Sequence, residues 1–198
     1  MLFYVHGQDR PGVQAEMEAL AEAHWSYMDR FADRLILRGP TLSDDGAEHT
    51  GSVHVVDLAD RASAERFATE EPYWQTGLYR DVTVARAVVL HHCEPAQGLP
   101  AGAALVTGQW PARPCDLPLS GADPDDQVSF VALLVDDGQS YTTGIVAVAG
   151  ALPGEAAGIV QPLADRLGGG PVALTAQRWT RGGRLPELPG GQLREVRG

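Results

Sequence analysis

The sequence predicts an α+β protein whose first half has the ferredoxin-like order β-α-β-β-α-β. Three observations support this class. Short apolar runs have the length of strands, stretches with helical apolar spacing lie between them, and short apolar runs return near residue 90. In this fold, two helices cover one face of a four-stranded antiparallel sheet. The other face would stay open, so something must cover it.

The first half begins with an apolar run over residues 2–7, which is too short for a helix. Pro11 suits the first turn of the helix that follows, and apolar residues recur on one face from Val13 to Phe31 at the 3.6-residue period. A strand is expected over 35–38, stopping at Gly39-Pro40, followed by a turn over 43–46 and a strand over 51–58. A short helix over 64–68 follows, capped by Asp60 or Ser63 and ended by Pro72. An aromatic connector over 73–79 then leads into a strand over 82–90.

The second half repeats this pattern without one helix. We expect strands over 104–107, 128–135, 141–148 and 172–179, and a helix over 155–167. The segment from Pro111 to Pro124 takes the place of the first helix and is too rich in proline to form one. The second half is therefore either a degenerate second copy of the first or an unrelated α+β unit. The expected division is a domain over 1–95, a linker over 96–103, a second domain over 104–184 and a tail over 185–198.

Composition excludes several classes of protein. The chain has 198 residues, of which 44% are hydrophobic and 21% charged, as in ordinary globular proteins. Its net charge of −11 repels phosphate backbones and anionic lipids, so we expect neither nucleic-acid nor membrane partners. No apolar run has the length of a membrane span and the first residues lack the pattern of a secretory signal, so we expect a cytoplasmic protein. Two cysteines are too few for a disulfide scaffold.

His24 is the first candidate for chemistry because it lies on the apolar stripe of the first predicted helix. Asp9 lies just after the first strand, at the turn into that helix. Both also have structural explanations, as a core histidine held by a hydrogen bond and as a cap or turn residue. His24 lies roughly 18 Å along the helix, so a contact with Asp9 requires a late-starting or broken helix. If the two residues pair, the carboxylate would fix the imidazole tautomer and create a general acid/base.

Several motifs in the first half occur in an order that resembles the YCII-related family. They are Gly7-Gln8-Asp9, Ala23-His24-Trp25-Ser26-Tyr27, Leu35-Ile36-Leu37-Arg38-Gly39-Pro40, Thr50-Gly51-Ser52, Glu71-Pro72-Tyr73 and Gly77-Leu78-Tyr79. The resemblance implies a ferredoxin-like unit of the dimeric α/β-barrel type, usually paired through its sheets, with a His/Asp pair in a small cleft. Typical members end near residue 95, so the present chain is expected to form either a homodimer or an internal pseudo-dimer.

The resemblance also implies a reaction class: cofactor-free lyase, dehydrohalogenase or isomerase chemistry on a small enolisable or phenolic metabolite. His24 would be the base and Asp9 its orienting partner, while a donor stabilises the developing oxyanion. The substrate-binding candidates, chosen by position, are Arg38, Ser43, Tyr73 and Trp74. One alternative is a non-catalytic protein that binds a small molecule or recruits a partner. Another is cofactor-free oxygenation, a chemistry of related ferredoxin-like dimers.

Other polar clusters are weaker candidates. His91-His92-Cys93 contains ligand groups, but adjacent residues rarely bind one metal together, so we expect no metal there. The family resemblance implies that no cofactor is used. His6 and His54 lie in strands that should be neighbours, and a structural role is favoured for both. The glycines at 168–170 follow a helix and are expected to end it.

Overall fold

The computed structural model describes residues 1–93, 102–115 and 124–184. The N-terminal half contains β1 (Leu2–Asp9), α1 (Gln14–Asp29), the 3-10 helix η1 (Ala32–Arg34), β2 (Leu35–Leu42), β3 (His49–Asp57), α2 (Arg61–Thr69), α3 (Pro72–Gln75) and β4 (Tyr79–His92). The C-terminal half contains β5 (Ala104–Pro114), β6 (Val128–Val135), β7 (Tyr141–Ala149), α4 (Pro153–Gly168) and β8 (Leu174–Trp179). The predicted ferredoxin-like order of the first half is confirmed. In the described part of the second half the same order occurs without its first helix.

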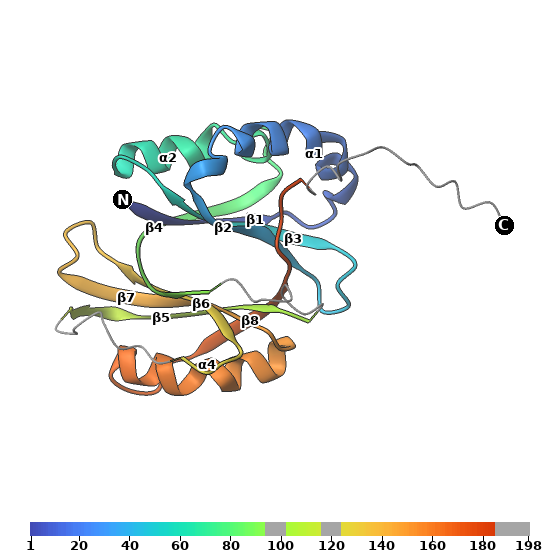
Figure 1. The fold of residues 1–198 in the computed structure, drawn as a ribbon. Helices are drawn as coiled ribbons and strands as arrows, with labels where there is room; N and C mark the ends of the chain where they lie inside the picture. The colour runs from blue at the N-terminus through green and yellow to red at the C-terminus, as the bar shows by residue number, and fades with distance from the viewer. Residues whose placement is uncertain (94–101, 116–123, 185–198) are drawn as a thin grey trace, which may run out of the picture.

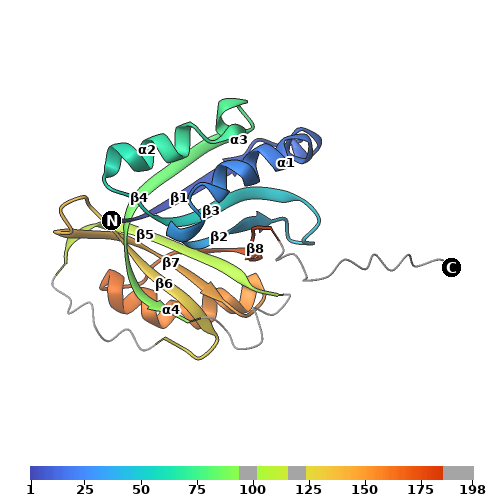
Figure 2. The same cartoon turned by 45° about the horizontal axis from the view of Figure 1, so that its top comes forward.

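The strands close into one antiparallel barrel in the order β1-β3-β2-β8-β5-β7-β6-β4. Helices α1 and α2 lie on the outside of the first sheet and α4 on the outside of the second (Figure 1). The turned view shows the two sheets facing each other between these helical layers (Figure 2). The open face of the first sheet is therefore covered, as predicted, by the second sheet of the same chain.

Both halves have the same strand order, β4-β1-β3-β2 in the first and β8-β5-β7-β6 in the second. Their glycines occupy matching places as well. A β-carbon at Gly51 of β3 would lie 2.5 Å from the carbonyl oxygen of Gly7, and one at Gly144 of β7 would lie 2.5 Å from that of Gly108. Each half therefore needs a glycine where its two central strands approach most closely. We propose that this match reflects a degenerate internal repeat.

The two seams between the halves differ in extent. Strands β4 and β6 pair from Arg86, opposite Val135, to His92, opposite Phe130. Strands β2 and β8 pair over two residues only, with Thr41 opposite Trp179 and Leu42 opposite Arg178. The seam between β4 and β6 is therefore long, whereas the one between β2 and β8 is short and is extended by backbone bonds from Thr180 and Gly182 to Pro40 and Arg38.

Alternation along the strands separates three apolar layers. Residues facing the barrel interior include Tyr4, Val53, Val55, Leu105, Phe130, Val148 and Trp179. The layer beneath the N-terminal helices includes Phe3, Val5, Tyr27, Met28, Val56 and Phe67. The layer beneath α4 includes Val106, Val131, Ile145, Val160 and Leu163. Along β1 and β3, successive side chains thus alternate between the layer beneath the helices and the interior of the barrel.

The predicted end of the second strand at Gly39-Pro40 is wrong, because β2 continues to Leu42. Pro40 lacks an N–H, but it still joins the sheet through its carbonyl oxygen, which accepts the N–H of Thr180 just after β8 at 3.3 Å. Strand β4 likewise runs past residue 90 to His92, and β5 continues through residues 111–114. The rest of the Pro-rich segment up to residue 123 lies outside the described residues.

Several local predictions are confirmed. Asp60 caps α2, its Oδ1 accepting the N–H of Ser63 at 2.7 Å. Gly169 ends α4 in the left-handed conformation, with φ of 68°. The expected aromatic connector contains one helical turn, α3, which Pro72 begins.

Of the described helices, none is long and apolar enough to cross a membrane. Both cysteines, Cys93 and Cys115, are free thiols. The tail predicted over 185–198 and all but the last two residues of the linker predicted over 96–103 lie outside the described residues.

Candidate active site

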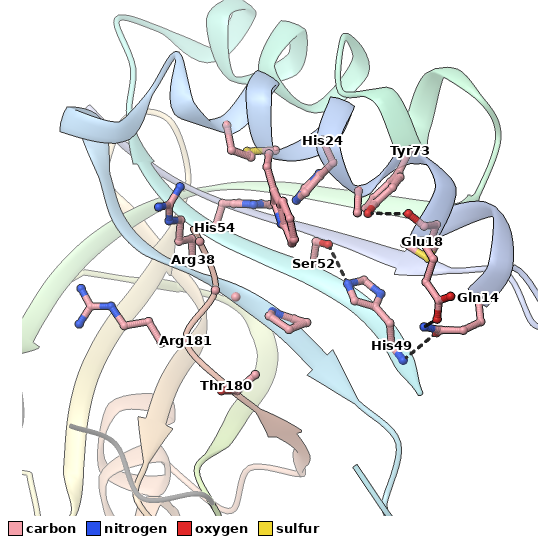
Figure 3. A pocket seen from close by; sticks show the side chains of 18 residues that line it. Gln14, Glu18, His24, Arg38, His49, Ser52, His54, Tyr73, Thr180 and Arg181 are labelled. Atoms are coloured by element: carbon pink, nitrogen blue, oxygen red, sulfur yellow. Dashed lines mark hydrogen bonds between the residues drawn. The ribbon is translucent and has the colours of Figure 1, made fainter. Parts of the chain in front are cut away.

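A cavity of about 280 Å³ lies between α1 and the outer face of β2 and β3 (Figure 3). Helix α1 contributes His24 and Trp25, and β2 contributes Arg38. Tyr73 of α3 closes one end. Residues 180–183, which follow β8, form the remaining wall, so both halves of the chain build this cavity.

His24 is held by Glu71, a residue not predicted as part of the site. The two side chains are almost fully buried, and His24 Nδ1 lies 2.6 Å from Glu71 Oε1. The other carboxylate oxygen accepts the N–H of Trp74 at 3.0 Å and so caps α3. An ionised carboxylate can only accept, so Nδ1 of His24 carries a proton that it donates. In the neutral ring Nε2 then keeps its lone pair, which is the arrangement of a general base.

Tyr73 fixes the plane of the same imidazole. Its ring stacks on that of His24 with centroids 4.5 Å apart and planes 6° apart. Its hydroxyl donates to the carbonyl oxygen of Met17 at 3.1 Å. Burial, with the nearby charges of Glu71 and Asp9, raises the pKa of Tyr73 to about 12. The phenol therefore stays neutral and serves as a rigid apolar wall with a satisfied hydroxyl.

Asp9 pairs with a different histidine. His49 Nδ1 donates to Asp9 Oδ2 at 2.6 Å, and Ser52 Oγ lies 3.3 Å from the other ring nitrogen of His49. The rings of His49 and Tyr73 meet edge to face, with their centroids 6.3 Å apart, and His49 lines the same cavity. Two histidine–carboxylate pairs therefore lie beside Tyr73. Figure 3 shows the two histidines, His24 and His49, with Tyr73.

The predicted direct contact between Asp9 and His24 does not form. Helix α1 starts at Gln14 and runs without a break to Asp29, so it carries His24 away from the end of β1. The helix axis thus brings His24 to the start of α3, where Glu71 takes the place predicted for Asp9.

His54 forms the floor of the cavity beside His24, with ring centroids 6.0 Å apart. Burial lowers the pKa of His54 well below its ordinary value, and repulsion from a protonated His24 and from Arg38 would lower it further. His54 is therefore neutral at physiological pH. It presents a polar but uncharged surface, which the sequence had not distinguished from a structural role.

The four substrate-binding candidates divide evenly. Arg38 and Tyr73 line the cavity, and their role in substrate binding stays a prediction. Ser43 lies outside it, where its hydroxyl donates to Asp45 Oδ1 at 2.6 Å within a turn. Trp74 also lies outside and packs beside Tyr73, while Trp25 of α1 supplies the indole of the cavity. Substrate binding by Ser43 or Trp74 stays a prediction that the position of this cavity does not support.

The chain after β8 ties the cavity wall together. Gly182 N donates to the carbonyl oxygen of Arg38 at 2.9 Å, which extends the contact with β2. Arg184 then reaches α1, where it lies 2.6 Å from Glu22 and 2.8 Å from Asp29, with its guanidinium 5.8 Å from the Trp25 ring. Figure 1 shows this segment, in red, rising from β8 to α1.

The C-terminal half does not repeat the polar wall. Taking Gly144 as the counterpart of Gly51, the positions of Ser52 and His54 are occupied by Ile145 and Ala147. Both are fully buried in the apolar layer beneath α4. The second half therefore contributes to the cavity only through residues 180–183, which follow β8.

The geometry offers no place for a bound metal among the described residues, because no three His, Cys, Asp or Glu side chains converge there. His92, a weaker ligand candidate, packs its ring against Phe130 at 5.8 Å. Neighbouring Cys93 is exposed. These side chains therefore do not form a cluster with a second group of ligands.

Fold and site together define a class: a single-chain α/β barrel of two ferredoxin-like halves, with a histidine-lined cavity outside the N-terminal sheet. Residues 1–87 match the family model of the YCII-related domain. The resemblance inferred from the sequence motifs is confirmed for this part of the chain.

Individual relatives divide into two groups by length. An uncharacterised protein of Haemophilus influenzae is 28% identical over 91 residues, which are 42% of this chain and 93% of the relative. The 5-chloro-2-hydroxyhydroquinone dehydrochlorinase of Burkholderia phenoliruptrix AC1100, solved in complex with 2,5-dihydroxybenzoquinone, is 27% identical over 43% of this chain and 92% of its own, with a TM-score of 0.41.

The second group spans both halves. A candidate monooxygenase from Lactobacillus acidophilus covers 92% of this chain and 96% of its own length, with 10% identity and a TM-score of 0.53. At this identity the likeness shows the fold alone. The two-half barrel therefore occurs as one chain in another protein.

Proposed function

We propose that the protein is a cofactor-free acid/base enzyme that acts on a small phenolic or enolisable molecule in the cavity beside His24. The observation that carries this proposal is the buried contact of 2.6 Å between His24 Nδ1 and Glu71 Oε1. It leaves Nε2 as the basic nitrogen of a histidine that lines the cavity. Glu71 stabilises the imidazolium that forms when Nε2 accepts a proton.

The reaction begins with transfer of a proton from a phenolic hydroxyl, or from carbon next to a carbonyl, to Nε2 of His24. The electron pair left behind forms an enolate or phenolate, which the guanidinium of Arg38 stabilises. In a lyase or dehydrohalogenase reaction that pair expels a leaving group as an anion. In an isomerase reaction the proton returns to another carbon. The pair formed by His49 and Asp9 supplies a second acid/base on the other side of Tyr73.

The dimensions of the cavity suit a one-ring substrate. Its volume of about 280 Å³ lies at the small end of ligand sites. The side chains of Trp25, Met17 and Met28 provide apolar walls against which a flat ring would pack. The polar groups lie on the floor and at one end, so the substrate would be orientated with its oxygens toward the histidines.

The test is proton exchange measured directly. The protein is incubated in deuterium oxide with 5-chloro-2-hydroxyhydroquinone and a panel of one-ring phenols and enolisable ketones, and deuterium incorporation and chloride release are followed. We expect at least one compound to react, and we expect His24→Gln to reduce the rate by about a hundredfold or more. His91→Gln, on β4 and outside the cavity, is the matched control. Compounds that bind without exchange or release in the wild-type protein would favour a binding protein instead.

A further inference from the structure

We propose that the end of the barrel holds a second ligand site, for a polyhydroxylated carboxylate of hexose size. A separate cavity of about 500 Å³ lies there, lined by the ends of β1, β3, β4 and β8 and by the loop before α1. It shares only Gln14 and His49 with the cavity beside His24. The proposal does not depend on the catalytic role of His24.

Two arginines in this cavity are available to an anion. Arg80 Nη2 donates to the side-chain oxygen of Gln8 at 2.7 Å, and Arg10 Nε donates to the carbonyl oxygen of Tyr79 at 3.5 Å. Neither guanidinium forms an ion pair with a carboxylate within residues 1–93, 102–115 and 124–184. Guanidinium groups bind carboxylates in bidentate geometry, so these two residues favour an acidic ligand.

The wall also contains an unpaired donor and an unpaired acceptor. Tyr4 OH lies 3.1 Å from His6 Nδ1, and a buried phenol that donates its proton leaves Nε2 of His6 protonated. This Nε2 and Asp9 Oδ1 are both buried, and neither has a hydrogen-bond partner among the described residues. Buried polar atoms are nearly always paired in native proteins, so both atoms favour a polar ligand.

The remaining polar residues favour hydroxyl groups over a simple anion. Thr50, Thr175 and Gln177 line the cavity with groups that both donate and accept. Asp9 and Glu48 add two acceptors, which would repel an inorganic anion but bind the hydroxyls of a sugar acid. A carboxylate with several hydroxyls is thus the chemistry that satisfies both the arginines and the acids.

A ligand bound in the second cavity should change the NMR signals of the His49 ring. Asp9 Oδ2 binds His49 Nδ1, and Asp9, whose other carboxylate oxygen is buried without a partner among the described residues, lines the second cavity. Because His49 lines both cavities, its ring signals report on a ligand in the barrel end even when the cavity beside His24 is empty.

The experiment is an NMR titration of the full chain with D-gluconate, following the ring signals of His6 and His49 and the side chain of Arg80. Sorbitol, which lacks the carboxylate, and hexanoate, which lacks the hydroxyls, are the matched compounds. We expect gluconate to bind at least about tenfold more tightly than either. Arg80→Gln should weaken gluconate binding by about tenfold or more and leave weak sorbitol binding unchanged.

Arg86→Gln, further along the same strand and outside both cavities, is the control and should bind gluconate as the wild type does. His24→Gln should also bind it normally, which separates this site from the catalytic proposal. The proposal is overturned if gluconate shifts none of these signals at millimolar concentration. Equal affinity for gluconate and hexanoate, or equal weakening by the Arg80 and Arg86 substitutions, would also overturn it.

Discussion

His24 and Glu71 form a buried pair in which Glu71 Oε1 lies 2.6 Å from Nδ1 of the imidazole. The other oxygen of the same carboxylate, Oε2, accepts the N–H of Trp74 and caps α3. The helix cap and the orientation of the base are therefore set by the same side chain. Tyr73, in the turn that Glu71 caps, stacks on the imidazole. The proposed base is thus positioned by the local fold of residues 71–75.

Substituting Glu71 by Gln tests this arrangement. The amide has a single oxygen, so it can accept either the N–H of Trp74 or that of His24 but not both, and it cannot stabilise an imidazolium by charge. We expect turnover of any substrate found in the exchange assay to fall by about tenfold or more with little change in KM. Glu70→Gln, at the adjacent exposed position, is the control. Unchanged turnover in Glu71→Gln would show that the carboxylate has no part in the reaction.

Two glycine substitutions should change the free energy of unfolding in opposite directions, because one position is crowded and the other is open. Gly51→Ala places a β-carbon 2.5 Å from a backbone oxygen, which cannot move without shifting β1. We expect the free energy of unfolding to fall by about 2 kcal/mol. Gly158→Ala, in the middle of α4 with no atom near the new carbon, should raise it by about 1 kcal/mol. Urea unfolding measures both, and equal effects would refute the packing argument.

Stability should fall between pH 7 and pH 5 because two histidines are buried in the neutral form. Burial lowers the pKa of His6 to about 4, and that of His54 well below its ordinary value. Once unfolded, both rings take up a proton below pH 6.5, so the free energy of unfolding falls as the pH drops from 6.5 toward 4. For His6 alone the full change is roughly 3 kcal/mol.

Urea unfolding at pH 7 and pH 5 measures this dependence, and His6→Gln should reduce its slope. The carboxylates of Asp45, Asp60 and Asp137 have lowered pKa values, so their contributions change only at more acidic pH. A free energy of unfolding that stays constant from pH 7 to pH 5 would contradict the burial of neutral histidines.

The segment after β8 should loosen when Arg184 is replaced. Arg184→Gln removes the contacts with Glu22 and Asp29 on α1. We expect faster hydrogen exchange at the N–H of Gly182, whose bond to Arg38 closes the cavity wall. Because these charges are exposed, high salt should produce part of the same effect in the wild-type protein. Arg166→Gln on α4 is the control, and identical exchange in all three proteins would exclude an anchoring role for Arg184.

Local sequence signals predicted most of the fold. The alternating pattern of residues 52–57 and the helical spacing around Met17 and Met28 are short-range properties, and both elements formed as expected. The strand through Gly39-Pro40 was missed because its tolerance of proline depends on which strand lies beside it. That neighbour, β8, is contributed by the far end of the chain.

The site was predicted less completely, for the same physical reason. His24, Arg38 and Tyr73 carry local signals and were found. The contact of Asp9 with His49 depends on the irregularity in pairing after Gln8, which no sequence pattern shows. Glu71 had one usable signal, its place directly before Pro72, which is typical of a helix cap, but a cap position does not indicate a histidine partner.

The most direct test of the central claim is the tautomer of His24, measured by long-range ¹H–¹⁵N NMR near neutral pH. The structure predicts that the neutral form of the ring carries its proton on Nδ1, held by Glu71, and leaves Nε2 unprotonated to accept a proton from a substrate. A neutral ring with the proton on Nε2 would contradict the account, because His24 could then not act as the base in this cavity.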